Sequence, residues 1–197
     1  MRNKEIRDLV FGAILMAFTI LLSLLYFFQV TGFAAITVAH IPVLVGGVLL
    51  GKKYGAFLGT VFGLTAMIFA FFTMGPNAPF TNPLLSVVPR ILFGFVTFFV
   101  YQAFNEKVKN RPIAIALTMA VSTLIHSLMV IPTLYLFVDW GFYFDAASNP
   151  LSNNQALIPF FIAVIGSNTI FEIIVAILVG TPIILAMDNV MYKNITK

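Results

Sequence analysis

The sequence predicts an all-α membrane protein: six transmembrane helices in one compact bundle, with both termini cytoplasmic. The chain has 197 residues, of which 60% are hydrophobic and only 9% charged, and its mean hydropathy is +1.03. Soluble domains carry roughly 25% charged residues, so this composition does not suit a water-facing surface. Because the apolar residues continue along the whole chain, we expect one membrane domain over residues 1–197.

Each helix is predicted from a stretch that approaches the roughly 20 apolar residues of a bilayer span. The predicted helices cover residues 8–28, 38–51, 54–73, 84–105, 112–138 and 157–189. The first is too long for the apolar core of a signal peptide, about 7–15 residues, so we expect it to be retained. The second is short and should reach only part of the bilayer. The sixth exceeds one span, which predicts tilt or a bent start.

The basic residues fix the expected orientation. In a six-helix topology, ten of the eleven fall on the same side: Arg2, Lys4, Arg7, Lys52, Lys53, Lys107, Lys109, Arg111, Lys193 and Lys197. The positive-inside rule makes that side cytoplasmic, in a bacterial-type cell membrane. The net charge of +4 therefore suits anionic lipid headgroups. Nucleic-acid binding is not predicted, because the sequence has no stretch that combines basic residues with stacking aromatics.

The eleventh basic residue, Arg90, lies inside the fourth predicted helix, in SVVPRILFG. A charged side chain at membrane depth is expensive and usually functional. Pro89 precedes it and can kink the helix, because proline lacks a backbone N–H. We interpret Arg90 as the binding group for an anion that enters from outside. Snorkelling to the headgroups, or a structural ion pair with Glu172, remains the alternative.

The sixth helix carries a polar stripe. Asn168 and Glu172 are four residues apart and share one helix face, with Thr169 beside them. The stripe can line a cavity, or it can join helices through hydrogen bonds. His126, in the fifth helix, and His40, at the outer start of the second, are polar residues that more often serve packing than ligand binding. Their spacing does not suggest a metal site.

Small residues indicate close helix contacts. Glycines recur every fourth residue from Gly47 to Gly63, which favours tight packing of the second and third helices. Ala13 and Ala17 form a small patch near the cytoplasmic end of the first helix, where a partner helix can dock. The chain has no cysteine and no Walker motif, so we expect no cofactor and no ATP site in this chain.

The chain resembles the S components, the substrate-binding subunits, of energy-coupling factor vitamin transporters. Three long stretches carry the resemblance: HIPVLVGGVLLGKKYGAFLGTVFGLT (40–65), NPLLSVVPRILFGFVTFFVY (82–101) and SNTIFEIIVAILVGTPI (167–183). The resemblance implies a protein that is no enzyme and binds a vitamin. It also implies partners: a transmembrane coupling subunit, which would contact Ala13 and Ala17, and two cytoplasmic ATPases that use the ATP.

PRILFG followed by NTIFE looks most like the pantothenate-type members, although Thr169 stands where their late motif often has glycine. Pantothenate carries a carboxylate, which a guanidinium fork binds well. The residues expected to bind substrate are Arg90, Asn168, Glu172, His126, Thr169, Asn82 and His40. Hydroxymethylpyrimidine, pyridoxine and folate remain alternative substrates. A self-sufficient carrier or channel is the alternative of another class, and an intramembrane enzyme using His126 and Glu172 is the least favoured.

Overall fold

The computed structural model describes residues 2–28, 38–73, 80–138 and 169–193, which are almost entirely helical. The labelled elements are α1 (Arg2–Phe28), the 3-10 turn η1 (Val38–His40), α2 (Ile41–Leu49), α3 (Lys52–Thr73), α4 (Pro83–Ser86), α5 (Val88–Lys107), α6 (Arg111–Val138), the π-helical segment η3 (Ala176–Gly180) and α8 (Thr181–Lys193). Residues 169–175 are α-helical and continue directly into η3.

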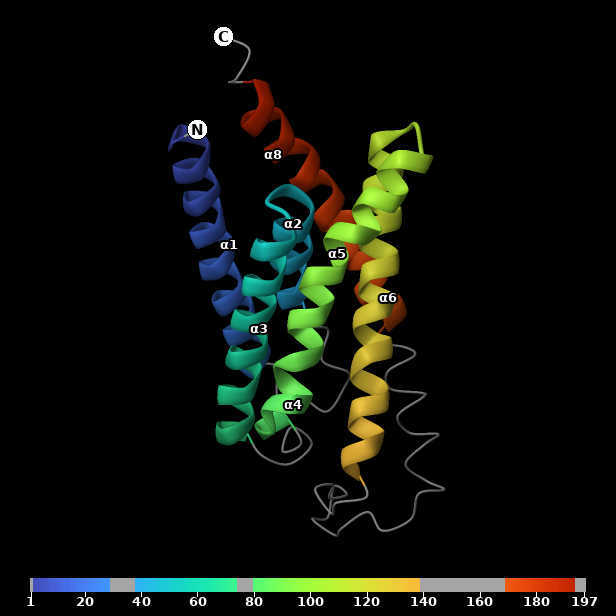
Figure 1. The fold of residues 1–197 in the computed structure, drawn as a ribbon. Helices are drawn as coiled ribbons and strands as arrows, with labels where there is room; N and C mark the ends of the chain where they lie inside the picture. The colour runs from blue at the N-terminus through green and yellow to red at the C-terminus, as the bar shows by residue number, and fades with distance from the viewer. Residues whose placement is uncertain (1, 29–37, 74–79, 139–168, 194–197) are drawn as a thin grey trace.

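The long helices run alongside one another (Figure 1). Within the described ranges, five stretches are long and apolar enough to cross a membrane: Lys4–Leu24, Lys52–Phe72, Pro83–Lys107, Arg111–Val130 and Thr169–Asp188. A further apolar stretch, Val38–Leu49, comprises η1 and α2 and is shorter than these five. At 1.5 Å per residue it is about 18 Å long, well short of the roughly 30 Å hydrocarbon layer. The expectation of a short second helix is therefore confirmed.

The hydrophobic core is built around α2. Every residue from Ile41 to Val48 is buried, and α2 contacts α1, α3, α5, η3 and α8. A helix that is apolar all round belongs in a protein core or a bilayer, and this one is enclosed by other helices. It ends at Leu49, with Leu50 as its C-cap, because Gly51 then has a φ of +94°, a left-handed conformation that glycine adopts without strain. This turn shortens the predicted helix 38–51 and lets α3 begin at Lys52.

Glycines bring α3 and α5 into backbone contact. A Cβ atom on Gly55 would lie 2.2 Å from the carbonyl oxygen of Gly94, and one on Gly59 would lie 2.1 Å from that of Arg90. One on Gly63 would lie 2.7 Å from the Cα atom of Val87. The glycine repeat thus allows close packing, as expected. Its main contact is between α3 and α5, whereas the sequence predicted packing between the second and third helices. Only residues without a side chain allow this separation, which fixes the start of α5 beside α3.

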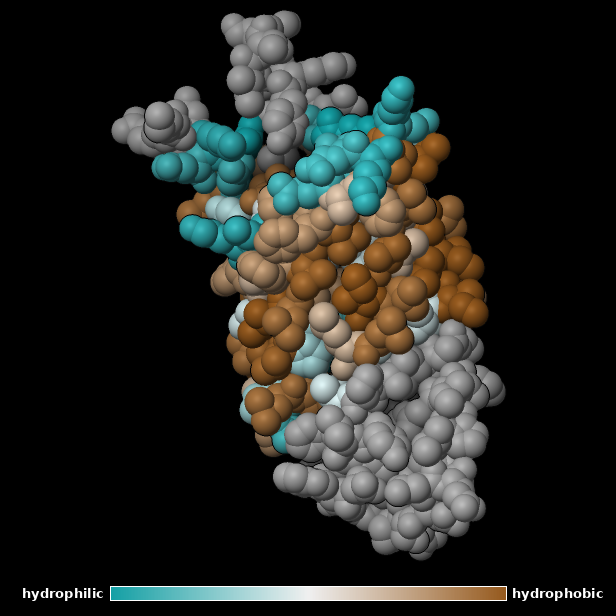
Figure 2. Space-filling model, turned by 45° about the vertical axis from the view of Figure 1, so that its right-hand side comes forward, coloured by the Kyte–Doolittle hydropathy of each residue, from teal (hydrophilic) through white to brown (hydrophobic). Residues whose placement is uncertain are grey.

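Apart from Arg90 and Glu172, the charged residues that the structure describes gather at one end of the bundle. The starts of α1, α3 and α6 and the ends of α5 and α8 lie together there (Figure 1). A hydrophilic cap covers this basic end, and a broad apolar band lies below it (Figure 2). Arg111 at the start of α6 forms an ion pair with the buried Asp188 of α8. This grouping agrees with the predicted topology, while its cytoplasmic orientation stays a prediction.

Two predicted helices need correction. The single helix expected at 84–105 is two helices, α4 and α5, which meet at Val87. The reason is Pro89, which has no N–H to donate to the carbonyl one turn earlier. The sixth predicted helix, 157–189, continues to Lys193 and contains the π-helical segment η3. Its expected bent start lies outside the described residues.

Candidate functional site

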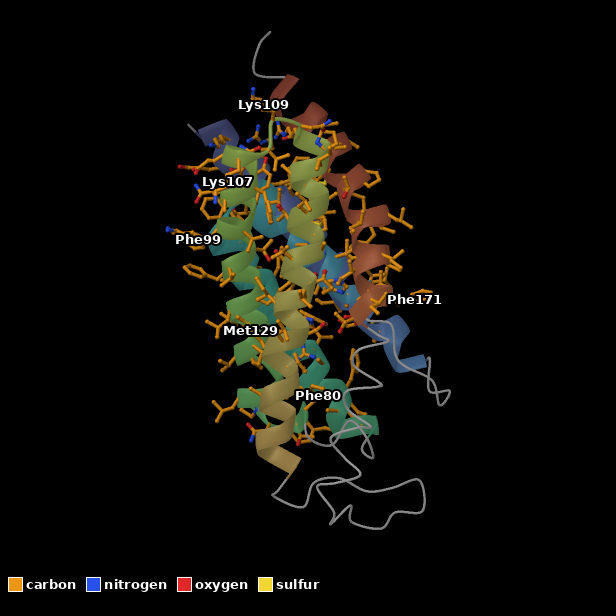
Figure 3. The ribbon with its side chains drawn as sticks, turned by 90° about the vertical axis from the view of Figure 1, so that its right-hand side faces the viewer. Phe80, Phe99, Lys107, Lys109, Met129 and Phe171 are labelled. Carbon is orange, nitrogen blue, oxygen red and sulfur yellow. The ribbon has the colours of Figure 1, made fainter. Side chains whose placement is uncertain are left out.

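Arg90 lies in the first turn of α5, at the end of the bundle opposite the basic end. Its side chain is buried, with 6% of its surface exposed. The guanidinium Nη1 donates a hydrogen bond of 2.6 Å to the carbonyl oxygen of Ser86. The guanidinium carbon lies 4.8 Å from the ring centre of Phe62 and 5.3 Å from that of Phe80. Figure 3 marks Phe80 at the end of the molecule far from Lys107 and Lys109.

The local sequence explains this orientation. Side chains of a helix lean toward its N-terminus, so the Arg90 side chain points back toward α4, away from the basic end. Ser86 ends α4, and its hydroxyl donates a 3.0 Å hydrogen bond to the carbonyl oxygen of Gly63 on α3. The same residue therefore ties α4 to α3 and accepts a hydrogen bond from Arg90. Two aromatic faces add cation–π attraction to the buried charge.

His40 and His126 meet next to this arginine. Their rings are nearly parallel, 8° apart in plane, with centres separated by 6.1 Å. The ring of His126 also lies 4.8 Å from Phe93 and 5.9 Å from Phe62, the ring that contacts Arg90. Thr123 Oγ1 lies 3.4 Å from Nε2 of His40. Three elements, η1, α3 and α5, thus surround His126 of α6 with rings.

The polar stripe of the sixth predicted helix is buried where it is described. Thr169 and Glu172 have 7% and 6% of their surface exposed. The intervening Ile170 and Phe171 are more than half exposed, and Phe171 points away from the bundle (Figure 3). Thr169 and Glu172 therefore face the interior of the bundle, and their role in substrate binding stays a prediction. Asn168 lies outside the described residues.

Two further groups of predicted residues have other surroundings. The side chain of Asn82 accepts a 2.9 Å hydrogen bond from the backbone N–H of Leu84, so it caps the N-terminus of α4. Its role in substrate binding stays a prediction. Ala13 and Ala17 are exposed on α1, on the face opposite the buried Leu15 and Thr19. Their position leaves room for a partner helix.

Sequence reasoning missed the aromatic walls of this site. Phe93 is three residues after Arg90 on α5, and helical spacing alone places both on neighbouring positions of one face. That signal was present in the sequence. Phe62 is far from Arg90 and His126 in the chain, and only the glycine-mediated approach of α3 to α5 brings it there. Thr123 likewise meets His40 only through tertiary packing.

Taken together, Arg90, His40, His126 and the rings of Phe62 and Phe93 form a compact cluster, which we call the arginine–histidine cluster. It combines one permanent cation, two imidazoles and aromatic walls. Such a combination of apolar walls and a few placed polar groups is typical of sites for small polar molecules. A guanidinium is well suited to a carboxylate, and imidazoles can donate to or accept from neutral polar groups.

The chain is similar to one known family and to two known transporters. Residues 7–184 match the family "ECF transporter, substrate-specific component". The pantothenic acid transporter PanT of Lactococcus lactis subsp. cremoris is 24% identical over 172 residues, which cover 78% of each chain. The pantothenate transporter PanT of Leuconostoc mesenteroides is 28% identical over 162 residues, 79% of this chain and 74% of the relative. Because the family match covers nearly the whole chain, the protein belongs to the substrate-specific components of ECF transporters.

Proposed function

We propose that the chain is the high-affinity substrate-binding subunit of an ATP-driven importer, and that its substrate is pantothenate. Two relatives named as transporters of pantothenate or pantothenic acid support the substrate. The structural observation that carries the proposal is the buried guanidinium of Arg90 at the end of the bundle opposite the basic end. A fixed guanidinium between aromatic rings attracts a carboxylate strongly, because little water competes for the interaction.

The alternative substrates differ in whether they carry a carboxylate that Arg90 could bind. Pantothenate has one carboxylate, two hydroxyls and an amide. Pyridoxine and hydroxymethylpyrimidine have no carboxylate, so a buried Arg90 makes them the least favoured substrates. Folate has carboxylates but also a large pterin ring. The cluster offers two imidazoles and the rings of Phe62 and Phe93 beside one cation, which suits a compact anion better.

Membership of this family implies partners that supply the energy. We propose that the chain lies in the cytoplasmic membrane with its basic end inside. There it would assemble with a transmembrane coupling subunit and two cytoplasmic ATPases, which use the ATP. The exposed Ala13 and Ala17 on α1 are the proposed contact for the coupling subunit. A self-sufficient carrier would instead take up substrate with no ATPase present.

The first test is isothermal titration of the purified chain with pantothenate, and with pyridoxine, hydroxymethylpyrimidine and folate as comparators. We expect tight binding of pantothenate alone. Tight binding of a comparator and none of pantothenate would overturn the substrate while leaving the family intact.

The second test addresses Arg90. Arg90→Ala removes the proposed carboxylate partner, and we expect pantothenate affinity to fall about a hundredfold or more. Arg90→Lys keeps the charge but loses the planar fork, so its affinity should stay well below wild type. Arg7→Ala, at the basic end, is the matched control and should bind normally. Unchanged affinity in a folded Arg90→Ala protein would assign Arg90 a structural role instead.

A further inference from the structure

We propose that Ser122 and His126 form a second recognition subsite, which hydrogen-bonds the hydroxyl-bearing end of the bound vitamin. This inference rests on the proposed function, because it divides one ligand between two groups of residues. Arg90 takes the carboxylate, and the pair on α6 takes the neutral polar end. The pair would thus determine which carboxylate-bearing molecules are accepted.

Ser122 and His126 are buried, and their polar side-chain atoms have no hydrogen-bond partner among the described residues. Ser122 and His126 are 1% and 6% exposed. Among the described residues, the Ser122 hydroxyl and both ring nitrogens of His126 have no hydrogen-bond partner. Buried polar atoms are nearly always paired in native proteins, so several such atoms in one place call for an absent partner. A polar ligand supplies it.

Neighbouring hydroxyls on α6 do have hydrogen-bond partners. Thr118 donates to the carbonyl oxygen of Ala114 at 2.8 Å, and Ser127 donates to that of Thr123 at 3.3 Å. Both hydroxyls are satisfied within α6. Ser122 lies one turn before His126, so the two unsatisfied side chains project from the same face.

The donor and acceptor pattern indicates the kind of group that binds. A neutral imidazole has one N–H donor and one acceptor nitrogen, and a serine hydroxyl also does both. A carboxylate only accepts, so it would use half of this capacity. An alcohol or an amide donates and accepts, as these two side chains do. The subsite therefore matches the hydroxyls and amide of pantothenate better than its carboxylate.

The surrounding rings place the two subsites next to each other. The ring of Phe62 lies 4.8 Å from the guanidinium carbon of Arg90 and 5.9 Å from the ring centre of His126. One aromatic side chain therefore contacts both recognition groups. The stacked ring of His40, which lies beside Thr123, restrains the orientation of His126. A single elongated ligand can thus reach both subsites across Phe62.

The experiment uses three ligands that differ at one end each. These are pantothenate, pantothenol, in which an alcohol replaces the carboxylate, and an N-acyl β-alanine that lacks both hydroxyls. Each is titrated into the purified chain and into the variants Ser122→Ala and His126→Leu. We expect each variant to weaken pantothenate roughly ten- to a hundredfold, because a ligand polar group loses its buried partner. Binding of the hydroxyl-free analogue should change less than threefold.

Arg90→Ala should show the opposite pattern. It should abolish the preference for pantothenate over pantothenol and keep the preference for ligands with hydroxyls. Ser127→Ala is the matched control, since its hydroxyl is satisfied within α6, and it should bind pantothenate normally. His126→Gln retains a donor and an acceptor and should recover most of the affinity lost in His126→Leu.

Three outcomes would overturn the inference. If Ser122→Ala and His126→Leu weaken all three ligands by the same factor, the pair is a structural support. If neither variant changes any affinity, the pair does not touch the ligand. If the wild-type chain fails to bind pantothenate at all, the proposed function fails with it, and the first titration shows this before any variant is made.

Discussion

Arg90 shows how neighbouring residues position a charge inside an apolar bundle. Pro89 separates α4 from α5, which leaves the carbonyl oxygen of Ser86 at the junction. The Arg90 guanidinium donates to that oxygen, and the rings of Phe62 and Phe80 cover its faces. These contacts stabilise the buried cation. A guanidinium held in a fixed position is suited to bind a carboxylate.

At the basic end of the molecule, an ion pair between Arg111 and Asp188 contributes to stability. Asp188 is 9% exposed at its side chain and pairs with Arg111, whose side chain is 51% exposed. Removing only the arginine leaves a buried carboxylate without its counter-charge, which is costly. Because Arg111 is half in solvent, we expect Arg111→Met to reduce the free energy of unfolding by about 1–2 kcal/mol. A thermal midpoint measured in detergent checks this.

The control for this prediction is Lys109→Met, which removes an exposed cation in the same connection between α5 and α6. It should leave the midpoint nearly unchanged. Both variants should bind pantothenate like wild type, since they lie at the end opposite Arg90. Equal midpoints for Arg111→Met and wild type would show that the ion pair contributes nothing to stability.

At the scale of elements, the contact between α3 and α5 positions the site. Gly59 lies against the backbone of Arg90, and a Cβ atom there would approach the Arg90 carbonyl oxygen to 2.1 Å. Backbone atoms must move to relieve such a contact, and overpacking of this kind typically costs about 1–3 kcal/mol. We therefore expect Gly59→Ala to lower the thermal midpoint and to weaken pantothenate binding at least tenfold, because Arg90 shifts.

Gly12→Ala provides the comparison, since it adds the same methyl group between α1 and α3. There the nearest atom, at 2.8 Å, belongs to the side chain of Tyr54, which can move aside. We expect a small change of midpoint and normal affinity. If Gly59→Ala folds and binds like wild type, the glycine contact does not control the position of Arg90.

At the scale of the whole molecule, one face of α1 is available for assembly. Ala13 and Ala17 are exposed, and so are the larger apolar residues Val10 and Ile14 on the same side. Small residues at such a position allow close approach of another helix in a membrane. Ala13→Leu combined with Ala17→Leu should therefore block uptake by the complete transporter, while pantothenate binding to the isolated chain stays normal.

Ala103→Leu, at an exposed position of α5, is the control for that prediction and should support normal uptake. Uptake is measured in membrane vesicles or cells that contain the coupling subunit and the ATPases. Normal uptake by the doubly substituted chain would place the partner contact elsewhere.

Much of the architecture was predictable because the bilayer imposes it. Length and hydropathy predicted the apolar helices, including the short second one, and the basic residues predicted a single charged end. The family was also predictable from three stretches of sequence, and the family match confirms it. Pro89 indicated a kink, but the division into two helices at Val87 and the π-helical segment η3 were not predicted. Both depend on local hydrogen bonds that a hydropathy pattern does not record.

The sequence by itself determined which residues are out of place in a membrane: Arg90, His126 and Glu172 are conspicuous because a bilayer makes polar groups rare. Only the tertiary structure decided which of them meet. His40 stacks on His126, and Phe62 contacts both Arg90 and His126, although these residues are distant in the chain. The reason is physical. Burial depends on each residue's own chemistry, whereas these contacts depend on how the helices pack. For Phe62 and Arg90, the glycines between α3 and α5 allow the close approach.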